Sequence, residues 1–138
     1  MAAGLTLDAG ALIAFDKADA RMRALLTTAA GRAVELTVPS LVVAQVWRGP
    51  SPRIARLLQS CVIEETLDAA TARVIGRLLA ASRTSDVVDA VVVYGAIRRG
   101  DTIATSDPVD IDRLIDAAHR LEGRRSRSIR QSVKVLRV

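Results

Sequence analysis

Four aspartates stand where the chain passes from one expected element to the next. Asp8 follows the apolar stretch "GLTL", and Asp107 follows "TIATS". Asp86 and Asp89 lie in "SDVVDAVVVYGAI", within the first turn of an expected helix. Carboxylates that share a pocket repel each other unless a cation joins them, and an all-oxygen ligand set selects Mg²⁺ or Mn²⁺. Such an ion activates water and neutralises charge on a phosphoryl group.

Three of these aspartates also fit a purely structural role as helix N-caps. Asp8 precedes a helix expected from residue 9, and Asp107 is followed by Pro108, a proline at the first helical position. Asp86 with Asp89 fits an acidic variant of the capping box. Taken one at a time, Asp86 and Asp107 are explained by capping at least as well as by metal binding.

Asp89 is harder to explain by capping alone. The helix around it is apolar almost all round, so we expect the helix to be buried. A buried carboxylate costs free energy unless it is paired or bound to a metal, and no Lys or Arg lies within one turn of Asp89. We therefore predict a metal ion, or a hydrogen-bond network around one, at this residue.

Alternating strands and helices would position these acids. The pattern predicts strands at 4–8, 33–39, 61–67, 101–106 and 129–138, and helices at 9–18, 19–32, 40–49, 51–61, 68–82, 85–100 and 107–121. We expect Ser40 to cap the third of these helices and Gly49 to end it. This order is typical of an α/β fold with a parallel sheet covered on both faces, in one domain over 1–138. Because ligands bind at the carboxyl ends of such strands, and the helix at 85–100 begins at that edge, the acids are expected to converge.

The composition limits the possible partners and compartments. A net charge of +5 and a sequence pI of about 10.6 favour an acidic partner, of which nucleic acid is the commonest. Aromatic residues make up only 2%, so phosphate contacts rather than base stacking would dominate. One cysteine and one histidine exclude an internal disulfide and a Cys/His zinc site. We find no signal peptide and no membrane-spanning stretch, and expect a cytoplasmic protein without membrane contact.

Four stretches, taken in order, resemble the PIN-domain ribonucleases, and within them the VapC-type toxins of bacterial toxin–antitoxin pairs. They are "LDAGALIAF", "VPSLVVAQVWRG", "VVDAVVV" and "IATSDPVDI", and together they span nearly the whole chain. The resemblance implies a PIN-like three-layer α/β/α fold with a small, mostly parallel central sheet. It also implies a Mg²⁺-dependent endoribonuclease that inhibits translation and growth, a homodimer, and a cognate antitoxin that covers the acidic pocket.

The resemblance assigns roles to particular residues. Asp8, Asp89 and Asp107 match the catalytic, metal-binding acids of the family, Thr105 matches a hydroxyl residue before the last acid, and Asp110 an extra acid often found there. Asp86 is a weaker candidate.

Gln45 departs from the family pattern. The family usually has a glutamate at this position. A glutamine still offers a carbonyl oxygen but adds no charge, which would weaken metal binding or shift the load to Asp86 or Asp110. Gln45 is alternatively a plain polar residue on the outer face.

Several arginines are candidates for holding RNA. Arg48 either faces the pocket and binds a phosphate or lies at a solvated helix end. Arg124, Arg125 and Arg127, with Arg120 and Arg130 nearby, would steer RNA or form an ordinary soluble surface.

Two other functions remain open from the sequence. The chain is alternatively a non-catalytic module that binds RNA or a protein, with Gln45 marking a degenerate metal site. A phosphorylatable receiver-like domain also has acids at strand ends, but it needs a Lys after a later strand. Here Lys134 lies within an expected strand, which speaks against that reading.

Overall fold

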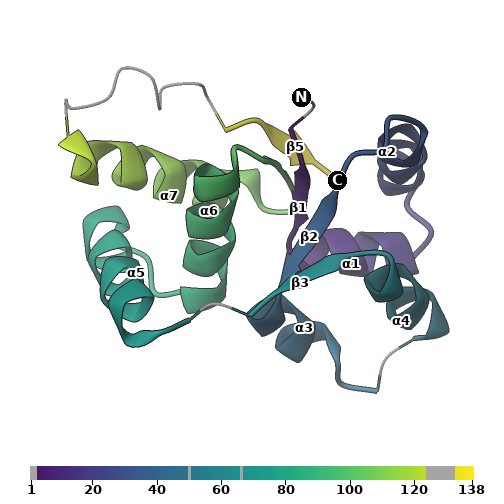
Figure 1. Ribbon diagram of the computed structural model, residues 1–138, viewed down its shortest axis with the longest axis horizontal. Helices are drawn as coiled ribbons and strands as arrows, with labels where there is room; N and C mark the ends of the chain where they lie inside the picture. Colours follow the sequence, from purple (N-terminus) through teal and green to yellow (C-terminus); the bar gives the residue numbers. More distant parts are fainter. Residues whose placement is uncertain (1–2, 50, 66, 124–132) are drawn as a thin grey trace.

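Five parallel strands form a single sheet at the centre of the molecule. The computed structural model describes residues 3–49, 51–65, 67–123 and 133–138, and all that follows concerns these ranges. The strands are β1 (Leu5–Leu7), β2 (Leu36–Pro39), β3 (Val62–Glu64), β4 (Thr102–Thr105) and β5 (Val135–Arg137). Their order is β3-β2-β1-β4-β5 and every neighbouring pair is parallel (Figure 1). The prediction of an α/β fold with a parallel sheet is confirmed.

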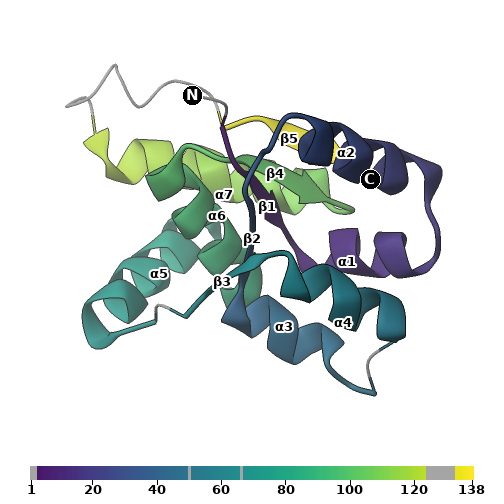
Figure 2. The same ribbon diagram turned by 45° about the vertical axis from the view of Figure 1, so that its right-hand side comes forward.

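Helices cover both faces of this sheet. The helices are α1 (Ala9–Asp16), α2 (Ala20–Gly31), α3 (Ser40–Val46), α4 (Pro52–Gln59), α5 (Ala69–Ser82), α6 (Val87–Arg99) and α7 (Pro108–Leu121). Helices α1 to α4 lie on one side of the strands and α5 to α7 on the other (Figures 1 and 2). The right-handed crossover rule explains this division, because the chain first builds the sheet from β1 towards β3 and then returns to add β4 and β5. The result is a three-layer α/β/α arrangement.

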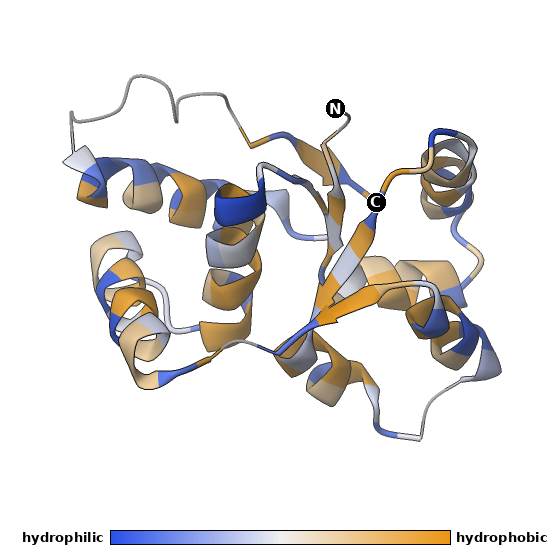
Figure 3. Cartoon of the chain, in the orientation of Figure 1, coloured by the Kyte–Doolittle hydropathy of each residue, from blue (hydrophilic) through white to orange (hydrophobic). Residues whose placement is uncertain are grey.

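The core consists almost entirely of aliphatic side chains. Leu7, Val38, Val92 and Ile103 are fully buried between the layers. Figure 3 shows hydrophobic residues along the strands and along the helix sides that face them. Burial of each such side chain contributes about 1.5–3 kcal/mol, so a core can form from this aromatic-poor composition. Within the described ranges, no helix is both long and apolar enough to cross a membrane.

Most expected helix ends are confirmed, and one helix differs at both ends. The side chains of Asp19, Ser51 and Asp68 accept N–H bonds from residues three positions on. The helix expected at 40–49 instead has Pro39 as its N-cap, without a side-chain hydrogen bond, and ends at Val46. The reason is that β2 stays extended through Pro39, so the next residue is already helical.

The two outer strands, β3 and β5, are shorter than expected. β3 covers three residues of the predicted stretch 61–67, and β5 covers three of 129–138. Residues 129–132 of that last prediction lie outside the described part of the chain.

Candidate functional site

Asp8 lies directly after β1, at the carboxyl edge of the sheet. Its Oδ1 accepts a hydrogen bond from the Ala11 N–H at 2.8 Å, which makes it the N-cap of α1. The residue is buried, with 6% of its surface exposed. Burial raises the pKa of this carboxyl, and the hydrogen bonds from Thr105 and Ala11 offset only part of that increase. The Asp107 charge raises the pKa further.

The end of β4 brings Thr105 and Asp107 next to Asp8. β1 and β4 are paired up to Leu7 and Ala104, and the Asp8 N–H donates to the Ala104 carbonyl at 3.3 Å. The fully buried Thr105 accepts the Asp107 N–H on Oγ1 at 2.9 Å, which fixes the turn into α7. Asp107 is exposed and caps α7 by accepting the Asp110 N–H at 3.5 Å.

Gly10 lets the two loops approach closely. A Cβ added to Gly10 would lie 2.8 Å from the Ser106 Cβ and would also meet the Ser106 hydroxyl oxygen. Only glycine fits here without moving the turn that carries Asp107. The first turn of α1 and the turn before α7 are therefore packed directly against each other.

Helix α6 delivers the remaining pair of acids to the same edge. Asp86 caps the helix, with its Oδ1 accepting the Asp89 N–H at 3.0 Å. Within the ranges described above, no hydrogen-bond donor and no Lys or Arg pairs with the Asp89 carboxylate. The structure corrects one expectation, since Asp89 is half-buried and not fully buried. The reason is its place in the first helical turn, at the edge of the sheet.

Electrostatic coupling shows that the acids form one group. Burial raises the pKa of Asp89 to about 7, with additional contributions from Asp86, Asp8, Asp107 and Asp110. Five carboxylates from three chain segments thus act on one another, and no cation balances Asp89 among the described residues. A divalent cation fits such an all-oxygen donor set and would lower the shared repulsion.

Capping and metal binding are compatible in this arrangement. The capping bonds of Asp86 and Asp107 use Oδ1, so the structure assigns no donor to Oδ2 of either residue within the described ranges. The carboxylates do not yet have the spacing of a metal site. Among the described residues, no three Asp, Glu, His or Cys side chains lie close enough together to hold an ion.

Of the other predicted site residues, one belongs to this group, two are exposed elsewhere, and three lie outside the described residues. Asp110 belongs to it and lies 4.0 Å from Arg113 in an exposed ion pair. Gln45 is exposed on α3, and Arg48 is exposed beyond the end of that helix. Arg124, Arg125 and Arg127 lie outside the described residues.

Sequence reasoning missed a polar network under the other end of α6. Arg99 pairs with Glu64 of β3, donates from Nε to Asp101 at 2.9 Å, and donates from Nη2 to Thr6 Oγ1 at 2.9 Å. The Thr6 hydroxyl in turn donates to Asp101 at 2.8 Å. One arginine therefore connects α6 to β1, β3 and the start of β4. The local signals were the charged residues Arg99, Glu64 and Asp101 at the ends of α6 and β3 and before β4, and Thr6 within β1 gave none.

Sequence reasoning also missed Arg137, because its position depends on how β5 pairs with β4. Thr105 and Arg137 are direct partners in that pair.

The chain matches no family model and no curated protein. The geometry and chemistry of the described residues therefore carry the functional inference.

Proposed function

We propose that this chain is a Mg²⁺-dependent endoribonuclease of the PIN-domain type. One observation carries the proposal: the half-buried Asp89 carboxylate has a pKa raised to about 7 by burial and four acidic neighbours, with no compensating cation in the described residues. A protein that keeps such a group in an otherwise basic chain maintains unfavourable electrostatics at one edge. A divalent cation at that edge would be bound by these carboxylates and would neutralise their mutual repulsion.

Asp8, Asp89 and Asp107 would hold the ion, with Asp86 and Asp110 completing its surroundings. Bound Mg²⁺ or Mn²⁺ supplies an activated water and neutralises charge on the phosphoryl group. The hydrolysis breaks one P–O bond of the RNA backbone; the water oxygen joins phosphorus and the leaving oxygen gains a proton. Thr105 keeps two of the acids in place, since it hydrogen-bonds to Asp8 and accepts the Asp107 N–H.

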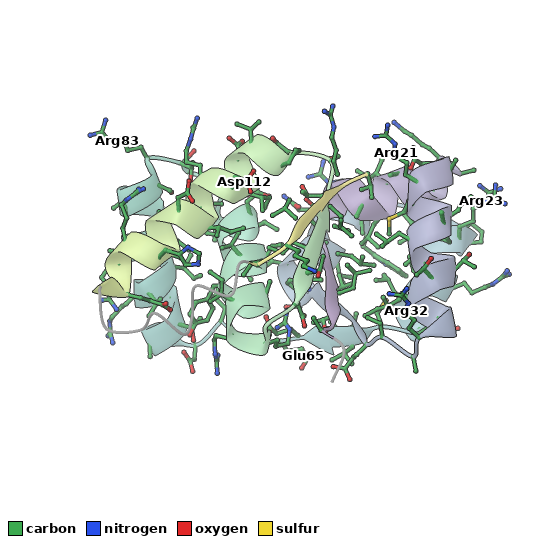
Figure 4. All side chains as sticks on the ribbon, turned by 90° about the horizontal axis from the view of Figure 1, so that it is seen from above. Arg21, Arg23, Arg32, Glu65, Arg83 and Asp112 are labelled. Atoms are coloured by element: carbon green, nitrogen blue, oxygen red, sulfur yellow. The ribbon has the colours of Figure 1, made fainter. Side chains whose placement is uncertain are left out.

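The charge distribution favours a polyanionic substrate. Apart from the five coupled carboxylates, the chain contains ten Asp and Glu residues and twenty Lys and Arg residues. Arg21, Arg23 and Arg32 project outward on one side of the molecule and Arg83 on the other (Figure 4). A basic exterior with one acidic edge holds RNA through its phosphates while a metal ion occupies the edge.

The resemblance adds a biological role to this proposal. It makes the chain the cytoplasmic toxin of a toxin–antitoxin pair, a homodimer that inhibits translation and growth and is silenced by an antitoxin over the acids. Val87 follows Asp86 and Val109 lies between Asp107 and Asp110, yet they are 43% and 65% exposed. A protein partner over the acidic edge would bury both valines, which supports this part of the proposal.

The test is an Asp8→Asn variant assayed for RNA cleavage and for growth inhibition. Asparagine caps a helix as well as aspartate does, so α1 is retained while the charge is lost. We expect at least about a 100-fold loss of Mg²⁺-dependent cleavage. The matched control is Asp112→Asn, an exposed acid of α7 that does not contribute to the Asp89 shift (Figure 4). Full cleavage by the Asp8 variant would contradict the proposal.

A second candidate function is a non-catalytic RNA- or protein-binding module, which Gln45 favours. It predicts that the wild-type chain binds RNA without cutting it and gains no thermal stability from Mg²⁺ or Mn²⁺. A Gln45→Glu variant separates the two functions. If the site is active but weak, the added carboxylate raises metal affinity by about tenfold. If the site is degenerate, the variant behaves like the wild type.

A further inference from the structure

Strand β5 brings a guanidinium to the acidic edge of the sheet. Thr105 of β4 and Arg137 of β5 are partners in the parallel register, and the Val138 N–H donates to the Thr105 carbonyl at 2.9 Å. On the other side of β4, the β1–β4 register extended by one residue sets Asp8 opposite Thr105. Partners in a parallel sheet point to the same face. Asp8, Thr105 and Arg137 therefore form a row across three neighbouring strands.

The spacing of this row suits a nucleic-acid backbone. Neighbouring strands lie about 4.8 Å apart, so the backbones at Asp8 and Arg137 are separated by about 10 Å. That is the length of about three stacked nucleotides at 3.4 Å each. A strand with one phosphate at the acids would place a nearby phosphate within reach of the Arg137 side chain.

Arg137 is exposed and not engaged by the acids beside it. Among the residues that the structure describes, no carboxylate lies within ion-pair distance of its guanidinium. Arg99, at the opposite end of the sheet, is instead bound to Glu64 and Asp101. Arg137 differs from the other unpaired arginines of the described residues by its place in the row with Asp8 and Thr105. A planar donor group that is free at an acidic edge is suited to a bidentate phosphate contact.

We propose that Arg137 binds an RNA phosphate close to the one at the acidic edge and so sets the strand in register with the acids. This inference rests on the proposed function, because it takes RNA as the ligand of that edge. The acids repel RNA and a metal ion offsets that repulsion. Arg137 supplies the one positive charge that the fold itself places in the row.

A charge on an edge strand also has a structural explanation, since it discourages pairing with other chains. Lys134 provides the control for that explanation. It lies just before β5 and is exposed, but it stands opposite Thr102 at the far end of the strand and on the other face of the sheet. Both residues protect the edge, and only Arg137 lies in the row with Asp8.

The experiment measures binding of a fluorescein-labelled single-stranded RNA of mixed sequence in the presence of Ca²⁺, a cation used to fill the acidic edge without supporting cleavage. Anisotropy titrations at several salt concentrations compare the wild type with Arg137→Gln, Arg137→Lys and Lys134→Gln. We expect Arg137→Gln to bind about five- to tenfold more weakly, with a salt slope smaller by about 0.7, the value for one lost phosphate contact. Arg137→Lys should keep the slope, and Lys134→Gln should match the wild type.

Each failure has its own signature. If Arg137→Gln and Lys134→Gln weaken binding equally, Arg137 is an ordinary surface charge and the inference is wrong while the proposed function stands. If the wild type binds no RNA at any salt concentration, the proposed function fails and the inference fails with it. Far-UV circular dichroism confirms that each variant is folded before it is compared.

Discussion

At the scale of single residues, Asp89 is the acid whose presence the fold does not explain. Asp8, Asp86 and Asp107 each stabilise a helix by accepting an N–H bond at its start. Asp89 caps nothing, and its carboxylate has no donor in the described part of the chain. Its charge therefore has no compensating contact within those ranges, and that makes Asp89 the most informative residue to titrate.

The stability of the metal-free protein should fall as the pH rises through the pKa of Asp89. This pKa is raised from 3.8 to about 7, so between these values the folded chain keeps a proton that the unfolded chain has released. The resulting stability is complete below the unfolded pKa and is lost as the pH passes about 7. We expect the melting temperature in chelator to drop by about 5 °C between about pH 5.5 and about pH 8.

Differential scanning fluorimetry across this range checks the prediction. An Asp89→Asn variant should lack the drop, and adding Mg²⁺ to the wild type at the upper pH should reverse it. Asp112→Asn, the exposed acid on α7, should keep the wild-type profile. A flat wild-type curve would mean that the Asp89 carboxylate is better solvated than its burial implies.

At the scale of elements, helix α6 carries two acids of the site at its start and is anchored to the sheet at its end. Its first turn carries Asp86 and Asp89, and its last turn is fixed to the sheet through Arg99. Asp101 is 5% exposed, so its charge depends on Arg99 and on the Thr6 hydroxyl for compensation. The network thus sets how α6 lies across β1 and β4.

Replacement of Arg99 by methionine should destabilise the fold strongly. The change leaves Glu64 and Asp101 without their cation. Breaking a fully buried pair costs about 3–5 kcal/mol, which is the upper bound for this partly buried network. The neighbouring Arg98→Met is the control, because that exposed side chain stacks on Tyr94, has no ion pair within the described ranges, and its loss costs about 0.5–1 kcal/mol. Urea unfolding followed by circular dichroism measures both. Equal losses for the two variants would show that the network adds little.

Local patterns predicted the elements, and tertiary pairing decided what they missed. Asp8 and Asp107 were recognised because an apolar run ends at each, and Asp89 because an acid interrupts an apolar helix. Arg99 was not recognised, since two of its partners, Glu64 and Thr6, lie on strands far away in the sequence. Arg137 was missed for a similar reason: its place depends on the β4–β5 register, and a slip of one residue would turn it to the other face.

At the scale of the whole molecule, charge is divided between an acidic edge and a basic remainder. The net charge of +5 hides this division, because the five coupled carboxylates offset part of a larger positive charge elsewhere. Under the proposed function, the edge without a metal ion would repel RNA while the remaining surface would attract it. A bound metal ion would remove the repulsion at the edge and leave the attraction unchanged.

RNA affinity should consequently increase when a divalent cation that does not support cleavage is added, beyond the effect of its ionic strength. We expect Ca²⁺ to tighten binding of the labelled RNA by about tenfold at constant ionic strength. Screening alone would weaken the binding instead. In Asp89→Asn the gain should shrink, because the weakened site takes up less cation. Binding that weakens equally in both proteins would mean that the cation acts only by screening, and the acidic edge would then not be where RNA and metal meet.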